Sequence, residues 1–364
     1  MSTTSFTILR PDDRHVHLRD SDDGRLARVI RFSAQQNFRM TVMPNLARSV
    51  RTHQDATSYL SRIYSAARHF GIQAESFHPD LALMLHRLTT PQDVLDAYGA
   101  GFWIWKYYPN AGTTESRSEL NALTDIRADT LAMMEALNVV LCIHGEVVPD
   151  VQPDELLREL DFIPQLSWLV EAYPALRVSV EHVSDRRMLA TIFDMPSNVI
   201  ATITPHHMST VRSDAERDAH SCCMPTAKTV EDMECLADAV THADEQPKLV
   251  SGTDTAPHYI VNKDDPEKQP RGVYSSPVAT PVMFAHMVQH CVDPVRTFEA
   301  FTVRNGMAFY GADDREEDRG TLTLVNEPWV VPEDHQGIKP WKYGEVLEWR
   351  VANMRWFGEA VAAK

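Results

Sequence analysis

The sequence contains few cysteines for its length, and their arrangement excludes a disulfide-stabilised fold. There are five among 364 residues, at positions 142, 222, 223, 235 and 291. Their number is odd and none has the CxxC spacing, whereas a disulfide framework uses an even set of cysteines. Few cysteines without a framework are typical of a reducing compartment, so the sequence predicts a cytoplasmic protein.

Long apolar runs and runs of basic residues are also absent. No stretch approaches the roughly 18–20 consecutive apolar residues of a membrane-spanning helix. Residues 1–10 lack the basic segment followed by an apolar segment that marks a secretory signal. The 51 acidic side chains outnumber the 35 basic ones, which gives a formal net charge of −16. Such a chain repels a phosphate backbone, so a nucleic acid is not expected as a partner. Because the long apolar run is missing, a membrane is not expected as a partner either.

What the sequence does contain is an alternation of short apolar runs with longer segments of helical periodicity. The eight predicted strands are 14–18, 40–43, 81–85, 101–106, 139–144, 177–182, 199–204 and 248–254. The predicted helices are 23–36, 53–70, 119–137, 154–173, 228–243 and 276–291. Eight alternating units predict a closed parallel (β/α)8 barrel of the α/β class. An open doubly wound sheet is the alternative, but no GxGxxG motif follows the first strand.

The C-terminal part has a different pattern. At roughly 150 residues per domain the chain would hold about two domains, although a single barrel commonly exceeds 250 residues. Residues 320–325 and 346–351 alternate like short exposed strands. We therefore expect a barrel over residues 1–318 and a small appendage over residues 319–364 that packs on the barrel.

A His-x-His motif lies in the first predicted strand. His15 and His17 are two positions apart, so in an extended strand both imidazoles point to one face, about 7 Å apart along the strand. This placement suits one metal ion. Alone the motif is a weak signal, because two half-exposed strand histidines would give the same pattern.

Further candidate ligands end other predicted strands. Lys106 ends the fourth, His144 the fifth, His182 the sixth and Asp254 the eighth. Each has an ordinary structural explanation by itself: a surface lysine, a core histidine, an ion-paired histidine and a turn aspartate. Their coincidence is better explained by an active site, because barrel enzymes build theirs at the C-terminal ends of the strands.

The chemistry of this set points to zinc. Three or four neutral imidazoles and one carboxylate are a normal ligand set for Zn²⁺. A lysine is unexpected among them because its ammonium repels a metal ion, but reaction with CO₂ turns the amine into an anionic carbamate. A carbamate on Lys106 would have two oxygens and could bridge two metal ions about 3.5–4 Å apart.

Taken together, the motifs resemble those of the amidohydrolase superfamily and, more closely, of the monofunctional class II dihydroorotases. The matching strings are RPDDRHVHLRD (10–20), MPN (43–45), KYYP (106–109), HGE (144–146), EH (181–182), ATITP (201–205) with His207, and GTDTAPH (252–258). The resemblance continues to NG (305–306) and FYG (309–311). It implies the reversible cyclisation of N-carbamoyl-L-aspartate to L-dihydroorotate in pyrimidine synthesis.

For the metal site, the resemblance implies two Zn²⁺ ions in each subunit, joined by a carboxylated lysine and a hydroxide. The implied ligands are His15, His17 and Asp254 for the more buried ion and His144 and His182 for the other, with Lys106 as the bridge. Asp254 would also accept the proton of the hydroxide and deliver it to the leaving nitrogen.

The resemblance also implies contacts with the substrate. Arg19, Asn45 and His258 would hold its carboxylate, a task for which the planar fork of a guanidinium is suited. The other implied contacts are Met224, which stands in place of an aliphatic residue, Ser276, near which the family pattern resumes, and Thr113 and Thr114. The two threonines resemble the family's mobile loop that covers the substrate, although an ordinary polar loop would have the same composition. The charged segment 261–271 departs from the family, whose bacterial members often have cysteines there.

Other functions remain open at this point. Hydantoinases, dihydropyrimidinases and allantoinases share the metal ligands and differ in the anion site, so Arg19, Asn45 and His258 discriminate between them. An interaction protein that has lost catalysis would be expected to lack metal ligands, and all of them are present. Because the relatives are commonly homodimers, the resemblance implies a homodimer that acts on a small molecule.

Overall fold

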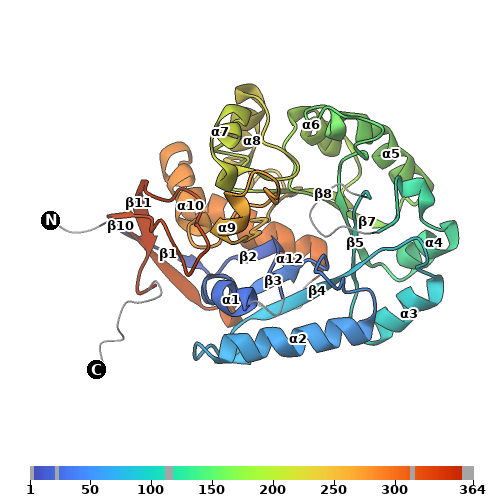
Figure 1. Cartoon of the computed structure of the whole chain (residues 1–364), viewed down its shortest axis with the longest axis horizontal. Coiled ribbons are helices and arrows are strands. Elements are labelled where there is room, and N and C mark those ends of the chain that lie inside the picture. The colour runs from blue at the N-terminus through green and yellow to red at the C-terminus, as the bar shows by residue number, and fades with distance from the viewer. Residues whose placement is uncertain (1–3, 21–23, 111–117, 312–315, 355–364) are drawn as a thin grey trace.

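The computed structural model describes residues 4–20, 24–110, 118–311 and 316–354. Its centre is a barrel of eight parallel strands, in which each strand pairs with the next along the chain (Figure 1). These strands are β2 (Asp12–Val16), β3 (Arg39–Val42), β4 (His78–Met84), β5 (Ile104–Tyr107), β6 (Val140–His144), β7 (Arg177–Glu181), β8 (Val199–Ile203) and β9 (Leu249–Ser251). The α/β barrel predicted from the alternation is confirmed.

The barrel closes where the chain that follows β9 meets β2. His17 donates its backbone N–H to the carbonyl of Thr255, and Asp254 donates its own to the carbonyl of His15, both at 2.9 Å. Val16 and Thr255 form a parallel bridge between these hydrogen bonds. The first and the last strand are therefore joined by residues that are expected to bind metal.

Helices cover the outside of the barrel (Figure 1). They are α1 (Arg25–Gln36), α2 (His53–Arg68), α3 (Pro91–Gly99), α4 (Ala128–Ala136), α5 (Arg158–Ala172), α6 (Arg186–Asp194), α7 (Arg212–Arg217), α8 (Val230–Val240), α9 (Ile260–Lys263), α10 (Ala279–His290), α11 (Pro294–Glu299) and α12 (Asn305–Tyr310). Short helical turns are η1 (Ala74–Ser76), η2 (Leu123–Asp125), η3 (Ala219–Ser221), η4 (Ala300–Arg304) and η5 (Glu316–Asp318). Before α2, α3 and α8 a threonine hydroxyl accepts the N–H of an aspartate three residues later, which satisfies backbone donors and fixes the start of the helix.

Two helices begin four or more residues later than the sequence predicts. Residues 119–137 are predicted as one helix, but α4 begins only at Ala128. The Asp125 carboxylate accepts the N–H groups of Asn121 and Ala122 and so closes the separate turn η2. The helix predicted from residue 154 likewise begins four residues later. The nine-residue helices α3 and α6 are not predicted at all, since two turns offer too few positions for a clear apolar period.

A small antiparallel sheet lies beside the barrel and contains one strand that the sequence pattern does not predict. Its order is β1 (Ser5–Leu9), β10 (Thr321–Val330) and β11 (Val346–Val351), so the N-terminal strand pairs with the first of the two expected C-terminal ones. The sheet packs on α10, where the Phe284 ring lies 5.4 Å from that of Phe6 and 5.5 Å from that of Trp349. The division of the chain at residue 318 stays a prediction.

Buried charges connect this sheet to the barrel. Asp12, at the start of β2, accepts hydrogen bonds from the guanidinium groups of Arg14 and of Arg319, which precedes β10. All three side chains are buried. A charge can stay buried when it is paired with an opposite charge. These ion pairs therefore keep the segment before β10 next to β2, the strand that carries His15.

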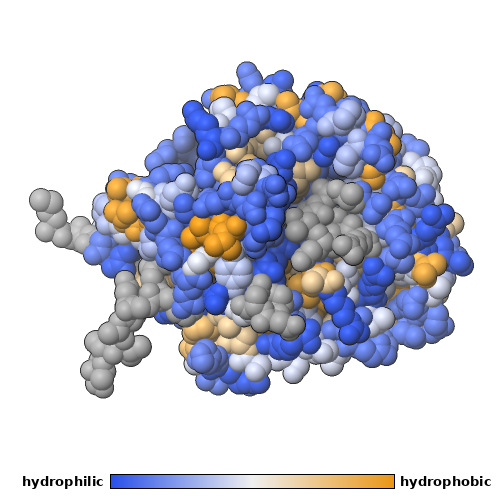
Figure 2. All heavy atoms as spheres, in the orientation of Figure 1, coloured by the Kyte–Doolittle hydropathy of each residue, from blue (hydrophilic) through white to orange (hydrophobic). Residues whose placement is uncertain are grey.

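The face drawn in Figure 2 is mostly hydrophilic, with hydrophobic residues scattered over it in small groups. No helix in the described part of the chain is long and apolar enough to cross a membrane.

Candidate metal centre and active site

The six predicted metal ligands lie at one end of the barrel, where the parallel strands end. His15 lies in β2, Lys106 in β5 and His144 at the end of β6, while His17, His182 and Asp254 follow β2, β7 and β9. All six side chains are buried. Because strand ends of a parallel barrel converge, residues far apart in the sequence meet here.

The imidazoles of His15 and His17 and the carboxylate of Asp254 form one compact group. The Nε2 atoms of the two histidines are 3.3 Å apart, and Asp254 Oδ1 lies 3.5 Å from that of His15 and 3.0 Å from that of His17. One ligand atom from each residue lies within 4.8 Å of the others. This group can hold a metal ion.

His144 and His182 form a second pair beside this group. His144 Nδ1 is 3.2 Å from His182 Nε2, and the ring centroid of His182 is 4.9 Å from that of His15. Burial holds the pKa of His182 well below its ordinary value, and the neighbouring His144 and Lys106 act in the same direction. The imidazole is therefore neutral at pH 7, which is the form that binds metal.

Two glutamates that sequence reasoning left without a role orient these histidines. Glu181 Oε2 is 2.6 Å from His15 Nδ1, and Glu146 Oε2 is 2.7 Å from His144 Nε2. A carboxylate only accepts, so each of these ring nitrogens carries the proton and the other nitrogen of each ring keeps its lone pair for a metal. Burial alone would raise the pKa of Glu181, but the hydrogen bond with His15 outweighs it and lowers this pKa.

The amine of Lys106 is fully buried and has no hydrogen-bond partner within the described part of the chain. Its Nζ atom lies 4.8 Å from the centre of the Tyr108 ring. Burial lowers the pKa of this amine more than the carboxylates of Glu181 and Asp254 raise it, which favours the neutral form that reacts with CO₂. Since buried polar groups normally have partners, an unpartnered amine at this place fits a lysine that carries a further group.

The backbone of the site is strained at three positions. Arg19, His182 and Asp254 have φ angles of 53°, 44° and 44°. Residues other than glycine rarely adopt positive φ, and each such residue costs about 1–3 kcal/mol. The fold keeps these conformations because they turn the three side chains into the site, where barrel closure and the neighbouring strands fix them.

A cavity adjoins the two groups of candidate ligands. Its lining comprises His17, Arg19, Tyr108, His144, His182, Met224, Asp254, Ala256, Arg271 and Gly272. Arg19 Nη2 lies 3.3 Å from His258 Nε2, and Tyr108 donates its hydroxyl to Asn45 Oδ1 at 2.9 Å. Arg19, Asn45, Met224 and His258 are thus either in the cavity wall or in contact with a residue of it.

Of the other predicted substrate contacts, Ser276 alone belongs to the described residues. Ser276 Oγ lies 3.0 Å from the hydroxyl of Ser33, and its N–H donates to the Thr255 hydroxyl; Ser276 is not among the described lining residues. Thr113 and Thr114 lie outside the described residues.

Arg271 lines the cavity although the sequence pattern did not single it out. Its backbone is fixed on both sides, because the buried Lys263 donates to the carbonyls of Pro270 and Gly272 at 3.0 and 2.8 Å. Gly272 has a φ of 146°, and a Cβ there would lie 2.5 Å from the Ala256 carbonyl oxygen, so only glycine fits. The charged composition of residues 261–271 marked the segment as unusual but could not indicate which side chain faces the cavity.

Comparison with known proteins decides the family. The dihydroorotase of Coxiella burnetii (strain RSA 331 / Henzerling II) is 34% identical over 357 residues, which cover 95% of this chain and 97% of that protein. The chain belongs to the dihydroorotase family. The dihydroorotase of Saccharomyces cerevisiae, solved in complex with 5-fluoroorotic acid, is 25% identical with a TM-score of 0.85 and covers 97% of this chain and 98% of its own.

The family's barrel is shared more widely. The L-hydantoinase of Arthrobacter aurescens has a TM-score of 0.77 at 15% identity, over 96% of this chain and 85% of its own, and this likeness concerns the fold alone. No family model matches the sequence. The resemblance to dihydroorotases seen in the motifs is confirmed by the whole-length relatives.

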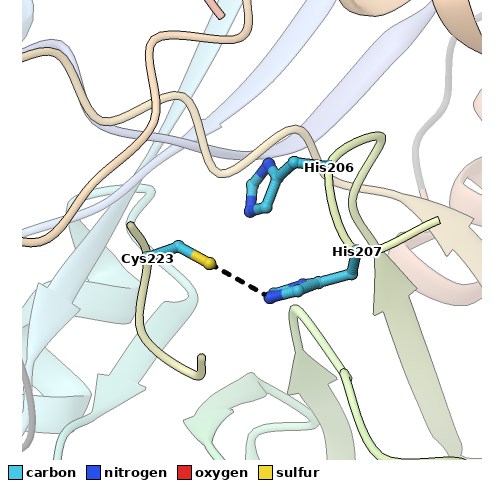
Figure 3. A group of neighbouring side chains, drawn as sticks. All are labelled: His206, His207 and Cys223. Atoms are coloured by element: carbon cyan, nitrogen blue, oxygen red, sulfur yellow. Dashed lines mark hydrogen bonds between the residues drawn. The ribbon is translucent and has the colours of Figure 1, made fainter. Parts of the chain in front are cut away.

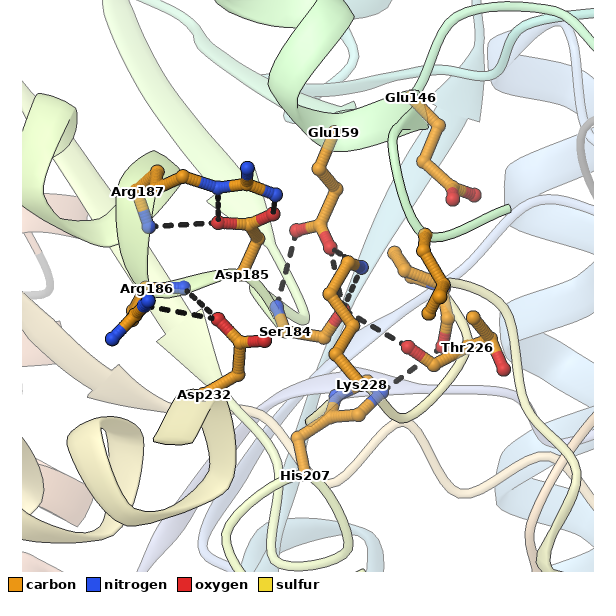
Figure 4. Close-up of polar contacts among 12 residues, drawn as sticks. Glu146, Glu159, Ser184, Asp185, Arg186, Arg187, His207, Thr226, Lys228 and Asp232 are labelled. Carbon is orange, nitrogen blue, oxygen red and sulfur yellow. Dashed lines mark hydrogen bonds and ion pairs between the residues drawn. The ribbon is translucent and has the colours of Figure 1, made fainter. Parts of the chain in front are cut away.

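Glu159 and Lys228 form a buried ion pair together with Ser184 (Figure 4). Glu159 accepts hydrogen bonds from Lys228 and from the hydroxyl and N–H of Ser184, while Lys228 Nζ also lies 2.6 Å from the Ser184 hydroxyl. Both charged side chains are 1% exposed. Burial alone would lower the pKa of Lys228, but the carboxylates of Glu159 and Glu146 outweigh it and raise this pKa, which favours the charged amine. Burial raises the pKa of Glu159, while the charge of Lys228 and the hydrogen bonds from Lys228 and Ser184 act in the opposite direction.

We expect Lys228→Met to lower the free energy of unfolding by about 3–5 kcal/mol, because it leaves Glu159 buried without a counter-charge. Urea unfolding at pH 7 measures this change. The matched control is the double variant Lys228→Met/Glu159→Leu, which removes both charges and should recover most of the loss. Equal losses in the single and the double variant would show that packing, not the unpaired charge, is responsible.

Proposed function

We propose that this protein catalyses the reversible cyclisation of N-carbamoyl-L-aspartate to L-dihydroorotate. The observation that carries the proposal is one cavity in which the guanidinium of Arg19 and the His17–Asp254 group lie together. The group suits a metal ion that acts on a carbonyl, and the guanidinium suits a carboxylate on the same small molecule. Membership in the dihydroorotase family supports the same substrate.

The proposed cofactor is a pair of Zn²⁺ ions. We assign His15, His17 and Asp254 to one ion, His144 and His182 to the other, and a carboxylated Lys106 to the position between them. The carboxylates behind His15 and His144 and the unpartnered amine of Lys106 fit this assignment. When bound, such ions polarise the reacting carbonyl and make a water molecule more acidic.

The residues of the chain then perform the proton transfer. In the ring-opening direction water adds to the ring amide carbonyl, and the carbon–nitrogen bond of that amide breaks. Asp254 accepts the proton of the attacking water and delivers it to the leaving ring nitrogen, so one carboxylate acts first as base and then as acid. In the biosynthetic direction the same carboxylate takes the proton from the carbamoyl nitrogen and returns it as water leaves.

The remaining cavity residues position the substrate. Arg19, Asn45 and His258 are proposed to hold the carboxylate that does not react, with Met224 against the ring. The 5-fluoroorotic acid in the yeast relative, a pyrimidine ring that bears a carboxylate, supports this type of ligand. A cover formed by Thr113 and Thr114, a contact from Ser276, a homodimeric state and a cytoplasmic location stay predictions.

The direct test compares substrates on one metal-analysed preparation. We expect hydrolysis of L-dihydroorotate and formation of it from N-carbamoyl-L-aspartate, with little turnover of hydantoin, dihydrouracil or allantoin. Turnover of hydantoin without turnover of dihydroorotate would instead favour a hydantoinase, whose fold is similar. No turnover of any of these in a zinc-loaded sample would favour a non-catalytic member of the family.

Arg19 distinguishes these alternatives at the level of one side chain. Arg19→Met should raise KM for N-carbamoyl-L-aspartate about ten- to hundredfold, because a hydrogen bond to a charged group contributes about 1.5–3 kcal/mol. Arg48→Met is the matched control, since the Arg48 side chain is 92% exposed. If only the melting temperature changes and KM stays constant, Arg19 has a structural role.

A further inference from the structure

A second group of metal-binding side chains lies outside the residues assigned above. His206 and His207 follow β8, and Cys223 follows η3. All three are buried, with exposures of 1%, 2% and 1%. One nitrogen or sulfur atom from each lies within 4.8 Å of the others.

The three side chains face a common space (Figure 3). Cys223 Sγ is 3.4 Å from His207 Nε2, and the ring centroids of the two histidines are 4.6 Å apart. Two imidazoles and a sulfur converging from two separate loops form a donor set of mixed nitrogen and sulfur. Such a set selects borderline and soft cations over Mg²⁺ or Ca²⁺.

The ring nitrogens of His206 favour a ligand between these residues. Neither of its ring nitrogens has a hydrogen-bond partner within the described part of the chain, although both are buried. A buried polar group without a partner costs about 1–3 kcal/mol, so native proteins rarely keep one unless a ligand or an ion completes it. A cation in the space between the three side chains would accept a lone pair from His206.

Neither a reactive thiol nor a disulfide explains the group. Burial raises the pKa of the Cys223 thiol to about 12, so the thiol is protonated at pH 7 and is a poor nucleophile. The neighbouring Cys222 points elsewhere, since its thiol donates to the Ala215 carbonyl at 2.9 Å. Both cysteines are free.

We propose that His206, His207 and Cys223 bind a divalent cation of the zinc type, at a site separate from His15, His17 and Asp254. Two imidazoles and a thiolate are three of the four ligands of a tetrahedral zinc site, and the fourth position would take water. Binding releases the thiol proton. His207 Nε2 and Cys223 Sγ lie 3.0 and 3.1 Å from the Pro225 carbonyl oxygen. When they bind the cation, they give up these contacts. The ring proton of His207 moves to Nδ1, which has no partner among the described residues.

The place of this site gives the cation a structural role. Cys223 directly precedes Met224, which lines the cavity, and the two histidines belong to the turn after β8. A bound cation would join these two loops and thereby fix the cavity wall at Met224. The proposal does not depend on the reaction that the protein catalyses, because it concerns donors that have no part in the proposed chemistry.

Cobalt substitution tests the proposal on the full chain. Co²⁺ bound to a thiolate has a near-ultraviolet charge-transfer band, and the His15, His17 and Asp254 group contains no sulfur. We expect the band in the Co²⁺-loaded protein, its loss in Cys223→Ser and His206→Ala, and its retention in the matched control Cys222→Ser. Zinc analysis should show one equivalent per chain fewer in Cys223→Ser than in Cys222→Ser.

Absence of the band from the cobalt-saturated wild type would overturn the proposal, and so would its persistence in Cys223→Ser. Circular dichroism and melting curves identify a variant that fails to fold. In that case His206→Gln, which keeps a polar side chain of similar size, replaces His206→Ala. An unchanged band and zinc content in a folded His206→Gln would likewise contradict the site.

Discussion

Replacing Lys106 with methionine should remove the bound metal and reduce the rate of dihydroorotate hydrolysis at least about a thousandfold. The Lys106 side chain is completely buried, and methionine keeps its length and its apolar part. The substitution removes the nitrogen of this side chain, which is the atom that would form the carbamate. Without this anion, Asp254 would be the one anionic side chain among the residues proposed to hold the two ions. The lost metal accounts for several kcal/mol of transition-state stabilisation, which corresponds to the expected loss of rate.

Two measurements and one control variant separate the carbamate from other roles of Lys106. Zinc analysis should show that the methionine variant retains little metal at this site. Carbon-13 NMR after incubation with labelled bicarbonate should show a carbamate signal in the wild type only. Lys248→Met is the matched control, because the Lys248 amine already donates to the carbonyls of Ile192 and Phe193, outside the site. Near-normal zinc content in Lys106→Met would contradict the bridge.

Replacing Asp254 with asparagine should lower kcat by a factor of about 10²–10⁴ while KM changes far less. Burial alone would raise the pKa of Asp254, but the hydrogen bond with His17 outweighs it and lowers this pKa, so the carboxylate is ionised at pH 7. An ionised carboxylate can take a proton, whereas an amide of the same shape cannot.

The interpretation requires that metal remains bound, since Asp254 is also a proposed ligand. The rate should therefore be compared at equal zinc content, with Asp20→Asn as control because the Asp20 carboxylate pairs with Arg62 outside the metal group. A kcat equal to that of the wild type at equal zinc content would exclude Asp254 as the group that transfers the proton.

The barrel could be predicted because its signal repeats eight times, and a repeated signal tolerates local errors. The start of α4 could not be predicted, because it depends on the single carboxylate of Asp125. This carboxylate closes a separate turn, although the apolar residues keep their helical spacing through it. Strand β1 was missed for a similar reason. It consists of five residues whose partners in β10 lie more than 300 positions away, and no local pattern reports such a pairing.

The residues of the site could likewise be predicted only where a pattern along the chain reports their position. The meeting of His15, His144, His182 and Asp254 could be predicted because each lies in or at the end of a predicted strand, and the topology of a barrel brings such residues together. The supporting Glu181 and Glu146 could not, since a glutamate beside a histidine has many ordinary explanations. Positions 206, 207 and 223 lie in loops, where sequence spacing carries no information about distance in space.

The closure of the barrel has a consequence for how this protein would depend on metal. Two of the hydrogen bonds that join the two ends of the strand circuit involve the backbone of His15, His17 and Asp254, with the Thr255 carbonyl as the acceptor for His17. An ion held by these side chains would cross-link the beginning of the barrel sequence to its end and close a loop of more than two hundred residues. Chelation would then act as the opening of a cross-link: the unfolding transition should move to lower temperature and the strands beside β2 and β9 should exchange their amide hydrogens first.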